Sequence, residues 1–177
     1  EGVLSEQFAT TVSARCGPAS AFLPLADNDD ALRWRLLLSD LATRSIDVQY
    51  YLWGRDESGR LLLQRLLAAA DRGVRVRILV DDMFLLDSDQ GIALLDSHPN
   101  IEISVFNPWQ ARGSVMLRGL EFLGRAKTLN RRMHNKLFVA DNRMAIVGGH
   151  NIGNPYFGLN DDYNFRDLEV LGIGPVV

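Results

Sequence analysis

The residues best suited to chemistry lie within residues 131–151, in the stretch RRMHNKLFVADNRMAIVGGHN. His134 offers a nucleophilic imidazole, and Lys136, two residues later, offers a cation. If KLFVA is a β-strand, period-two alternation places both side chains on one face, where they converge on one point. A nucleophile beside a cationic anchor is an arrangement suited to gripping and attacking a phosphate group.

The second part of this stretch predicts a hairpin that ends in an anion-binding backbone. Asp141 lies seven residues after His134, so alternation does not put it on the same face, and residues 141–143 are interpreted as a turn. The returning strand, residues 144–147, leads into Gly148 and Gly149. Two residues without Cβ let a ligand approach the backbone and leave N–H groups for an anion, with the Asn151 amide beside them.

The pattern H-x-K-x4-D-x6-G-G-x-N, which these residues fill, resembles the signature of the phospholipase D superfamily. Further stretches resemble bacterial cardiolipin synthase-like members, and the likeness covers the chain from about Ala21 onward. These stretches are SIDVQYYLW at 45–53, AADRGVRVRILVDD at 69–82, FNP at 106–108, NRRMHNK at 130–136 and FRDLEVLGIGPVV at 165–177.

The resemblance implies a phosphatidyltransferase that acts on phospholipid phosphodiesters through a phosphohistidine. In this interpretation His134 is the nucleophile, and Lys136 and Asn151 hold the phosphate, with Gly148 and Gly149 beside it. The resemblance also implies that no metal and no cofactor take part. The acceptor is expected to be a glycerol-containing lipid.

A neutral imidazole that attacks phosphorus needs a partner for its other nitrogen, to fix the tautomer. The signature includes Asp141 among the catalytic residues, but the parity argument makes Asp141 a brace in the turn. Asp167 opens the strand-like stretch DLEVLGI and matches the position where relatives carry an acidic residue near the catalytic histidine. We therefore expect Asp167 to orient His134.

Two departures from the family pattern limit the resemblance. Gly149 stands where many relatives have serine, which removes a hydroxyl contact to phosphate. The chain also holds a single H-x-K-x4-D, whereas family members build one active site from two copies, the second histidine serving as general acid. The chain is therefore interpreted as the amino-terminal half of a longer enzyme, completed by a second half in the same full-length chain or by a homodimer partner.

Two alternatives follow from the single motif. The first is a phosphodiesterase or nuclease that completes its site by homodimerisation. The second is a catalytically inactive half that only binds anionic lipid. A net charge of −3 argues against nucleic-acid binding over the whole surface.

Composition predicts one domain with a sizeable core, since 47% of the 177 residues are hydrophobic. Residues 1–22 are expected to form an amino-terminal arm and residues 23–177 the phospholipase D-like domain. No apolar run approaches the roughly 20 residues of a membrane-spanning helix. The expected partner is an anionic phospholipid, met by peripheral contact with the cytoplasmic side of a bacterial membrane.

Positive charge is concentrated just before His134. Residues 112–132 contain six basic residues and one acidic residue. A solvated basic loop is one interpretation, and attraction of an anionic substrate is the other; the position next to His134 favours the second. The residues are Arg112, Arg118, Arg125, Lys127, Arg131 and Arg132, with Glu121.

The remaining pattern predicts an α/β fold, a phospholipase D-like α/β/α sandwich with a mixed, largely parallel sheet flanked by helices. Strand, helix and strand over 45–80 form a right-handed βαβ unit, which puts Asp81 and Asp82 at a carboxyl edge of the sheet. Capping or salt bridging by these two aspartates is favoured over metal binding. A turn role is expected for His98 and a local structural role for His150.

The individual elements follow from periodicity, caps and breakers. Most of the stretch 108–133 has mixed signals and is predicted to be a mobile loop. The expected elements are a helix over 29–43 behind an Asn28/Asp29 cap, a strand over 45–53, a helix over 59–72 stopped by Gly73, a strand over 74–80, a short helix at 88–97, a strand over 101–106, and a short helix around 115–122.

Overall fold

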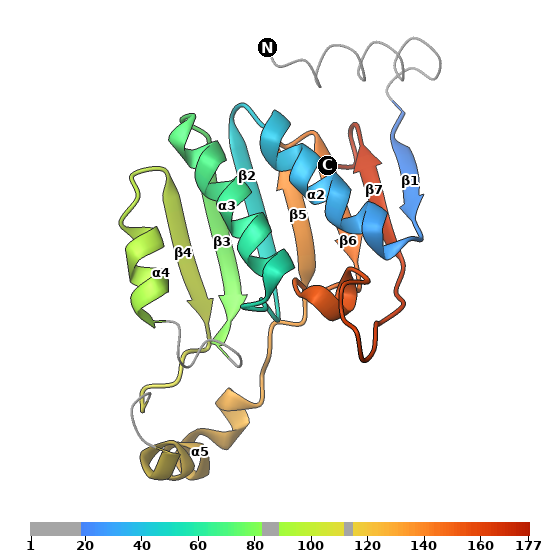
Figure 1. Cartoon of the computed structure of the whole chain (residues 1–177). Helices are drawn as coiled ribbons and strands as arrows, with labels where there is room; N and C mark the ends of the chain where they lie inside the picture. Colours follow the sequence, from blue (N-terminus) through green and yellow to red (C-terminus); the bar gives the residue numbers. More distant parts are fainter. Residues whose placement is uncertain (1–18, 83–88, 112–114) are drawn as a thin grey trace.

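A computed structural model describes residues 19–82, 89–111 and 115–177, and its centre is a seven-stranded sheet (Figure 1). The strands lie side by side in the order β1-β7-β6-β5-β2-β3-β4. Their bounds are β1 Ala21–Leu25, β2 Ser45–Tyr50, β3 Arg75–Asp81, β4 Ile101–Phe106, β5 Lys136–Ala140, β6 Met144–Gly148 and β7 Glu169–Ile173. The helices are α2 Asn28–Leu41, α3 Glu57–Asp71, α4 Asp89–Asp96 and α5 Val115–Leu129, with a short 3-10 helix η2 at Asn154–Tyr156.

The strand directions confirm an α/β fold with a mixed sheet, but the sheet is not largely parallel. Strands β2, β3 and β4 run parallel, and α3 connects β2 to β3 as predicted for a βαβ unit. The other four pairings are antiparallel. The cause is the hairpin of β5 and β6, since strands joined by a short turn must run in opposite directions and β7 then pairs antiparallel to β6.

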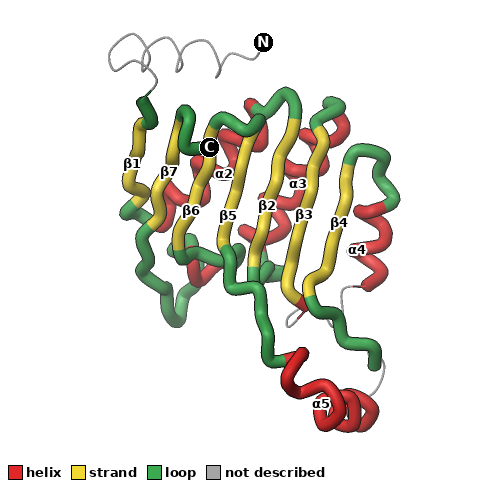
Figure 2. Tube along the Cα trace, turned by 180° about the vertical axis from the view of Figure 1, so that it is seen from behind, coloured by secondary structure: helices red, strands yellow, loops and turns green. Residues whose placement is uncertain are grey.

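The helices α2, α3 and α4 all lie against one face of the sheet, as Figure 2 shows from behind. This face carries the core, because Ile46, Val48 and Tyr50 of β2 are buried there together with the predicted row on β3. That row consists of Val76, Ile78 and Val80. Within the described ranges no helix covers the opposite face, so only one side of the expected sandwich is present.

Helix α5 corrects the prediction of a loop over most of 108–133. It runs from Val115 to Leu129 with a break at Arg125 (φ −124°, ψ 15°), and it extends beyond the sheet edge (Figure 1). Most of its apolar side chains, such as Met116 and Leu123, are exposed, and Leu129 at its end is buried, so the helix has no continuous core-facing stripe. Glu121 stabilises the helix by accepting hydrogen bonds from the backbone of the preceding loop and by pairing with Arg125.

Two boundaries also differ from the predictions. The N-cap of α2 is Asp27, one residue before the expected Asn28/Asp29 cap, and Asn28 instead bonds the backbone oxygen of Phe165. Strand β1 includes Ala21 and Phe22, so these two residues of the expected arm belong to the sheet, paired with β7. Residues 1–18 of that arm lie outside the described residues. No described helix is long and apolar enough to cross a membrane.

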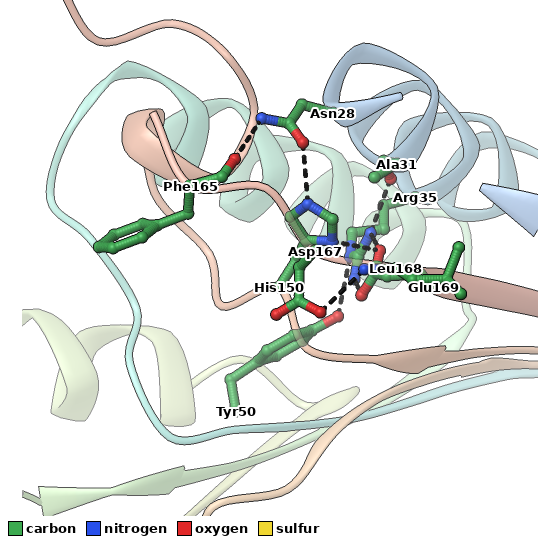
Figure 3. Close-up of polar contacts among 9 residues, drawn as sticks. All are labelled: Asn28, Ala31, Arg35, Tyr50, His150, Phe165, Asp167, Leu168 and Glu169. Carbon is green, nitrogen blue, oxygen red and sulfur yellow. Dashed lines mark hydrogen bonds and ion pairs between the residues drawn. The ribbon is translucent and has the colours of Figure 1, made fainter. Parts of the chain in front are cut away.

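A buried ion pair joins α2 to the first residue of β7 (Figure 3). Arg35 donates to both carboxylate oxygens of Glu169 at 2.6 Å and to the Tyr50 hydroxyl at 2.9 Å. Burial alone would raise the pKa of Glu169, but hydrogen bonds from His150 and Arg35 outweigh it and hold that pKa below its usual value. The pair thus fixes three elements, α2, β2 and β7, against one another.

We predict that Glu169→Ala lowers the free energy of unfolding by about 3–5 kcal/mol, because Arg35 loses its counter-ion inside the core. Urea denaturation followed by circular dichroism measures this. Because folding lowers the Glu169 pKa, its stabilisation is present above the unfolded pKa of about 4.3 and is lost as the pH falls through the native pKa. The difference between the two proteins should therefore shrink in acid.

Asp40→Ala is the matched control, since Asp40 forms an exposed pair with Arg65 at 3.2 Å. Its removal should change stability by no more than about 1 kcal/mol. Equal losses from the two substitutions would contradict the role assigned to the buried pair.

Candidate active site

His134 and Lys136 meet at the edge of the sheet where β2 and β3 end. Strand β5 runs antiparallel to β2 with Lys136 opposite Tyr50, so β5 begins at the carboxyl edge of β2. The Lys136 Nζ lies 2.9 Å from His134 Nδ1 and 3.0 Å from the His134 carbonyl oxygen. The predicted convergence of these two side chains is therefore present.

The surroundings of Lys136 reduce its affinity for a proton. Lys136 is only 6% exposed, and burial lowers the pKa of its ammonium, while the nearby Asp167 carboxylate partly opposes the shift. The Tyr51 ring lies beneath both groups, 5.6 Å from the Lys136 Nζ and 4.9 Å from the His134 ring. His134 itself is exposed, so a ligand can reach the imidazole from solvent.

The Asn151 side chain is fixed by two protein contacts, one of them to Leu52, the residue after Tyr51. Its side-chain oxygen accepts a hydrogen bond from the Leu52 backbone at 3.1 Å, and its amide nitrogen donates to the Tyr156 hydroxyl at 2.9 Å. A side-chain amide carries two N–H donors, so one remains for a ligand. Sequence reasoning did not identify Tyr51 or Tyr156 as parts of the site, because neither residue belongs to the motif.

The structure explains the absence of a side chain at Gly148 and at Gly149 by two different contacts. A Cβ at Gly148 would lie 2.5 Å from the Leu168 carbonyl oxygen and 2.7 Å from the Glu169 Cα, so β6 and β7 require glycine there to pair closely. A Cβ at Gly149 would lie 1.8 Å from a carboxylate oxygen of Asp167. The Asp167 carboxylate thus occupies the space that a side chain at position 149 would fill.

Asp167 lies just before β7, and its backbone position is set by the strand that follows. Its carboxylate accepts a hydrogen bond from the Leu168 backbone at 2.8 Å (Figure 3) and acts electrostatically on Lys136. The structure therefore brings Asp167 to the predicted phosphate site. Its role in orienting His134 stays a prediction.

Asp141 lies at the opposite end of β5 and does not join this group. It stands in the hairpin turn with φ 55°, beside Asn142 with φ 52°. Its carboxylate accepts hydrogen bonds from the backbone of Thr43, Arg44 and Ser45 at 2.7–3.2 Å. Burial would raise its pKa, but these hydrogen bonds lower it overall. This is the position expected of a brace, which here connects the hairpin to the start of β2.

Asp81 holds the segment that leads into His134, and Asp82 holds the loop after β4. Asp81 pairs with Arg132 at 3.0 Å and accepts a hydrogen bond from the Met133 backbone at 3.0 Å, while Asp82 accepts one from the Trp109 backbone at 2.6 Å. Salt bridging, one of the two favoured roles, is confirmed for Asp81, whereas the backbone groups of Met133 and Trp109 that these aspartates bind lie outside the described helices. Among the described residues, no group of three or more acidic, histidine or cysteine side chains forms a potential metal site.

His150 is fully buried and contacts residues of α2 and β7. Its Nε2 lies 3.1 Å from the Asn28 side-chain oxygen and its Nδ1 lies 3.4 Å from Glu169 (Figure 3). Its ring stacks on Phe157 at 6.2 Å. These contacts match the predicted local structural role. For His98, the contacts with Asp71 and the Asn100 backbone agree with the predicted turn role.

Comparison with solved structures identifies the class of fold. NucT from Helicobacter pylori aligns with a TM-score of 0.61 over 88% of this chain and 85% of that chain, at 18% identity. Phosphatidylserine synthase of Haemophilus influenzae Rd KW20 aligns with a TM-score of 0.59 over 86% of this chain and 33% of that chain, also at 18% identity. Nuc from Salmonella typhimurium, described as a phospholipase D family member, aligns with a TM-score of 0.58 over 88% of this chain and 84% of that chain, at 18% identity. Likeness at this identity establishes the shared fold.

Comparison of sequences identifies the family. Residues 38–168 match the family described as cardiolipin synthase, PLD-like domain, and the chain belongs to that family. It is 48% identical over 163 residues to cardiolipin synthase C of Escherichia coli (strain K12), covering 92% of this chain and 33% of the relative. It is 32% identical over 148 residues to the major cardiolipin synthase ClsA of Bacillus subtilis (strain 168), covering 82% of this chain and 28% of the relative. The chain thus spans about a third of the length of the curated relatives it matches.

We predict that Gly148→Ala destabilises the protein more than Gly149→Ala. The first Cβ meets the backbone of β7, and such overpacking costs about 1–3 kcal/mol. The second meets only the end of the exposed Asp167 side chain, which can turn away. Urea denaturation compares the two variants, and a larger loss for Gly149→Ala would contradict this assignment.

We also predict that Asp167→Asn lowers the pKa of Lys136 further, because it removes the carboxylate that favours the charged ammonium. The pH dependence of the Lys136 side-chain carbon signals in NMR measures the shift. Asp162→Asn, an exposed change in the same loop, is the control and should leave the titration unchanged. An unchanged Lys136 titration in Asp167→Asn would place Asp167 away from the site.

Proposed function

We propose that this chain is one catalytic half of a phosphatidyltransferase of the cardiolipin synthase type, acting on phospholipid phosphodiesters. The observation that carries the proposal is the meeting of His134 and Lys136 at 2.9 Å, with the Asp167 carboxylate acting on Lys136. An exposed imidazole next to a buried cation offers a nucleophile and charge stabilisation at the same point. Membership of the cardiolipin synthase family supports the lipid substrate.

In the proposed first step, the His134 Nε2 attacks phosphorus and the phosphorus–oxygen bond to the leaving alcohol breaks. Lys136 and the remaining N–H of Asn151 stabilise the nonbridging oxygens as negative charge grows on them. The leaving oxygen takes a proton from a general acid, which the second half of the enzyme supplies. In the second step, the hydroxyl of a glycerol-containing lipid gives its proton to the same group, now a base, and attacks the phosphohistidine, and the bond to His134 breaks.

The position of Lys136 suggests how the histidine becomes nucleophilic. An ammonium has only donors, so a charged Lys136 donates to His134 Nδ1, which then is an acceptor, and the proton of the neutral ring is on Nε2. Attack through Nε2 requires the other tautomer. A bound phosphate would draw the Lys136 ammonium away from Nδ1. Exchange with solvent would then move the ring proton of the exposed His134 from Nε2 to Nδ1, and Nδ1–H would donate to the Asp167 carboxylate. Asp167 is proposed as the orienter on this basis, and Asp141 as a structural brace.

The complete site is proposed to need a second H-x-K half, in the same full-length chain or in a homodimer partner. The expected substrate is an anionic phospholipid in the bacterial membrane, met by peripheral contact on the cytoplasmic side. The basic residues of 112–132 support attraction of such a surface, although Arg125 and Arg132 are engaged by Glu121 and Asp81. The net charge of −3 supports a lipid over a nucleic acid.

The full-length protein, expressed in a bacterium that lacks other cardiolipin synthases, should restore cardiolipin, and His134→Ala should abolish it. Lipid extraction and mass spectrometry measure the product. His98→Ala, in a turn distant from the motif, is the matched control and should retain activity. Phosphatidic acid alone would indicate a hydrolase, degraded DNA a nuclease, and lipid binding without turnover an inactive half.

The same assay separates the two aspartates. Asp167→Asn should reduce the turnover number by about 10²–10⁴-fold, the range seen when a catalytic histidine loses its acid–base or tautomeric support. Asp141→Asn should act mainly through stability, so its activity per folded molecule should stay near the parent value. Activity should also survive a chelator. A larger loss of activity in Asp141→Asn than in Asp167→Asn would contradict the roles assigned to the two aspartates. Loss of activity with EDTA would contradict a mechanism without a metal.

A further inference from the structure

An apolar groove is lined by residues of α3 and α4, two helices that lie on the same face of the sheet. Figure 1 shows the positions of these helices. Its volume is about 440 Å³. The floor is formed by β3 and β4 and the walls by the two helices. The floor residues are Ile78, Val80 and Ile103, and the wall residues include Leu63, Ile92 and Leu95. The size and the mainly apolar lining are typical of a small-molecule site of about 300–1,000 Å³.

The groove runs towards the same sheet edge that carries His134. Its floor residues Ile78 and Val80 lie in order along β3, and the next residue, Asp81, grips the segment before His134. The loop after β2 closes the groove with Trp53 and Gly54. The end of the groove at Trp53 and Gly54 therefore lies at the sheet edge where β2 ends, and β5 begins at the same edge.

One loop, residues 51–54, connects the groove with the proposed phosphate site. Tyr51 packs on the His134 ring, and the Leu52 backbone donates to the Asn151 side chain. One residue further, Trp53 forms a bridge with Ile152, and the Gly54 backbone donates to the Ile152 carbonyl oxygen at 2.7 Å. A molecule that fills both places would contact both sides of this loop.

The charged residues of the groove complement a phospholipid. Arg55 and Arg60 are exposed and line the groove, and its described lining contains no acidic residue. The neighbouring Asp56 carboxylate is directed to α3, where it accepts hydrogen bonds from Ser58 and Gly59. Two cations beside an apolar channel match a molecule with an apolar chain joined to an anionic, ester-rich head.

We propose that this groove binds one acyl chain of the phospholipid whose phosphate is held by His134 and Lys136, an inference that rests on the function proposed above. Arg55 and Arg60 then face the glycerol and phosphate region of the lipid. The groove selects substrates with long chains and leaves the headgroup free to be exchanged at the sheet edge.

The test uses Trp53 as a reporter in the wall of the groove. The chain has three tryptophans, so Trp34→Phe with Trp109→Phe leaves Trp53 alone. Its emission is compared in vesicles of dioleoylphosphatidylglycerol and of the same lipid with brominated acyl chains, which quench by contact. We expect a loss of Trp53 emission with the brominated lipid. If the double variant does not fold, quenching is measured in the parent protein and in Trp53→Phe. The difference between the two gives the quenching of Trp53.

Gly91 offers a way to fill the groove without disturbing the backbone. It lines the groove in α4, and a Cβ there would meet nothing within 4 Å. Gly91→Phe should abolish the quenching and should lower kcat/KM of the full-length enzyme for dioleoyl lipid more than for dihexanoyl lipid. The matched control is Gly119→Phe in α5, where a Cβ also meets nothing within 4 Å, and it should change neither measurement.

The two proposals fail in different ways. Quenching that depends on Gly91, in a protein without transferase activity, would support the groove and overturn the proposed function. Cardiolipin synthesis with equal Trp53 emission in both lipids would overturn the groove. Quenching that survives Gly91→Phe would also overturn the groove proposal. If that variant keeps its quenching and changes its oligomeric state, the groove belongs to contact with a second copy of the chain.

Discussion

The site depends on the register between β5 and β2. Lys136 is opposite Tyr50, on the face that the helices cover, and a slip of one residue would move Lys136 to the other face of the sheet. Both ends of β5 are fixed by buried or partly buried carboxylates. Asp141 binds the backbone before β2 at one end, and Asp81 binds the backbone before His134 at the other. The relative positions of His134 and Lys136 follow from these two contacts.

The buried ion pair of Arg35 and Glu169 also restricts the position of Asp167. Tyr50, which faces Lys136 in the register, is also bound by Arg35, and Arg35 holds Glu169 at the start of β7. Asp167 lies two residues before Glu169, so the fixed start of β7 sets where Asp167 can reach. A single network thus positions Lys136 and the start of the strand that follows Asp167, while His134 and Asp167 themselves are exposed.

Much of this arrangement could be predicted from local sequence. The hairpin of β5 and β6 follows from alternation and from Asp141 and Asn142 in a turn with positive φ, and α3 follows from its apolar spacing and Gly73. The short helix predicted around 115–122 lies within α5, but its extension to Leu129 could not be predicted, because most apolar residues of this helix are exposed and form no core stripe. The grip of Asp81 on Met133 joins residues 52 positions apart, which no local pattern encodes. The hydrogen bond between Asn151 and the Tyr156 hydroxyl likewise forms only in the folded chain.

The central claim is that this chain carries a preformed phosphate site at His134 and Lys136. Titration of the chain with inorganic phosphate, followed by the backbone and side-chain NMR signals, tests it most directly. The account predicts saturable shifts at His134, Lys136, Gly149 and Asn151 that disappear in Lys136→Ala. Shifts confined to the arginines of α5, or shifts at His134 that persist in Lys136→Ala, would contradict it.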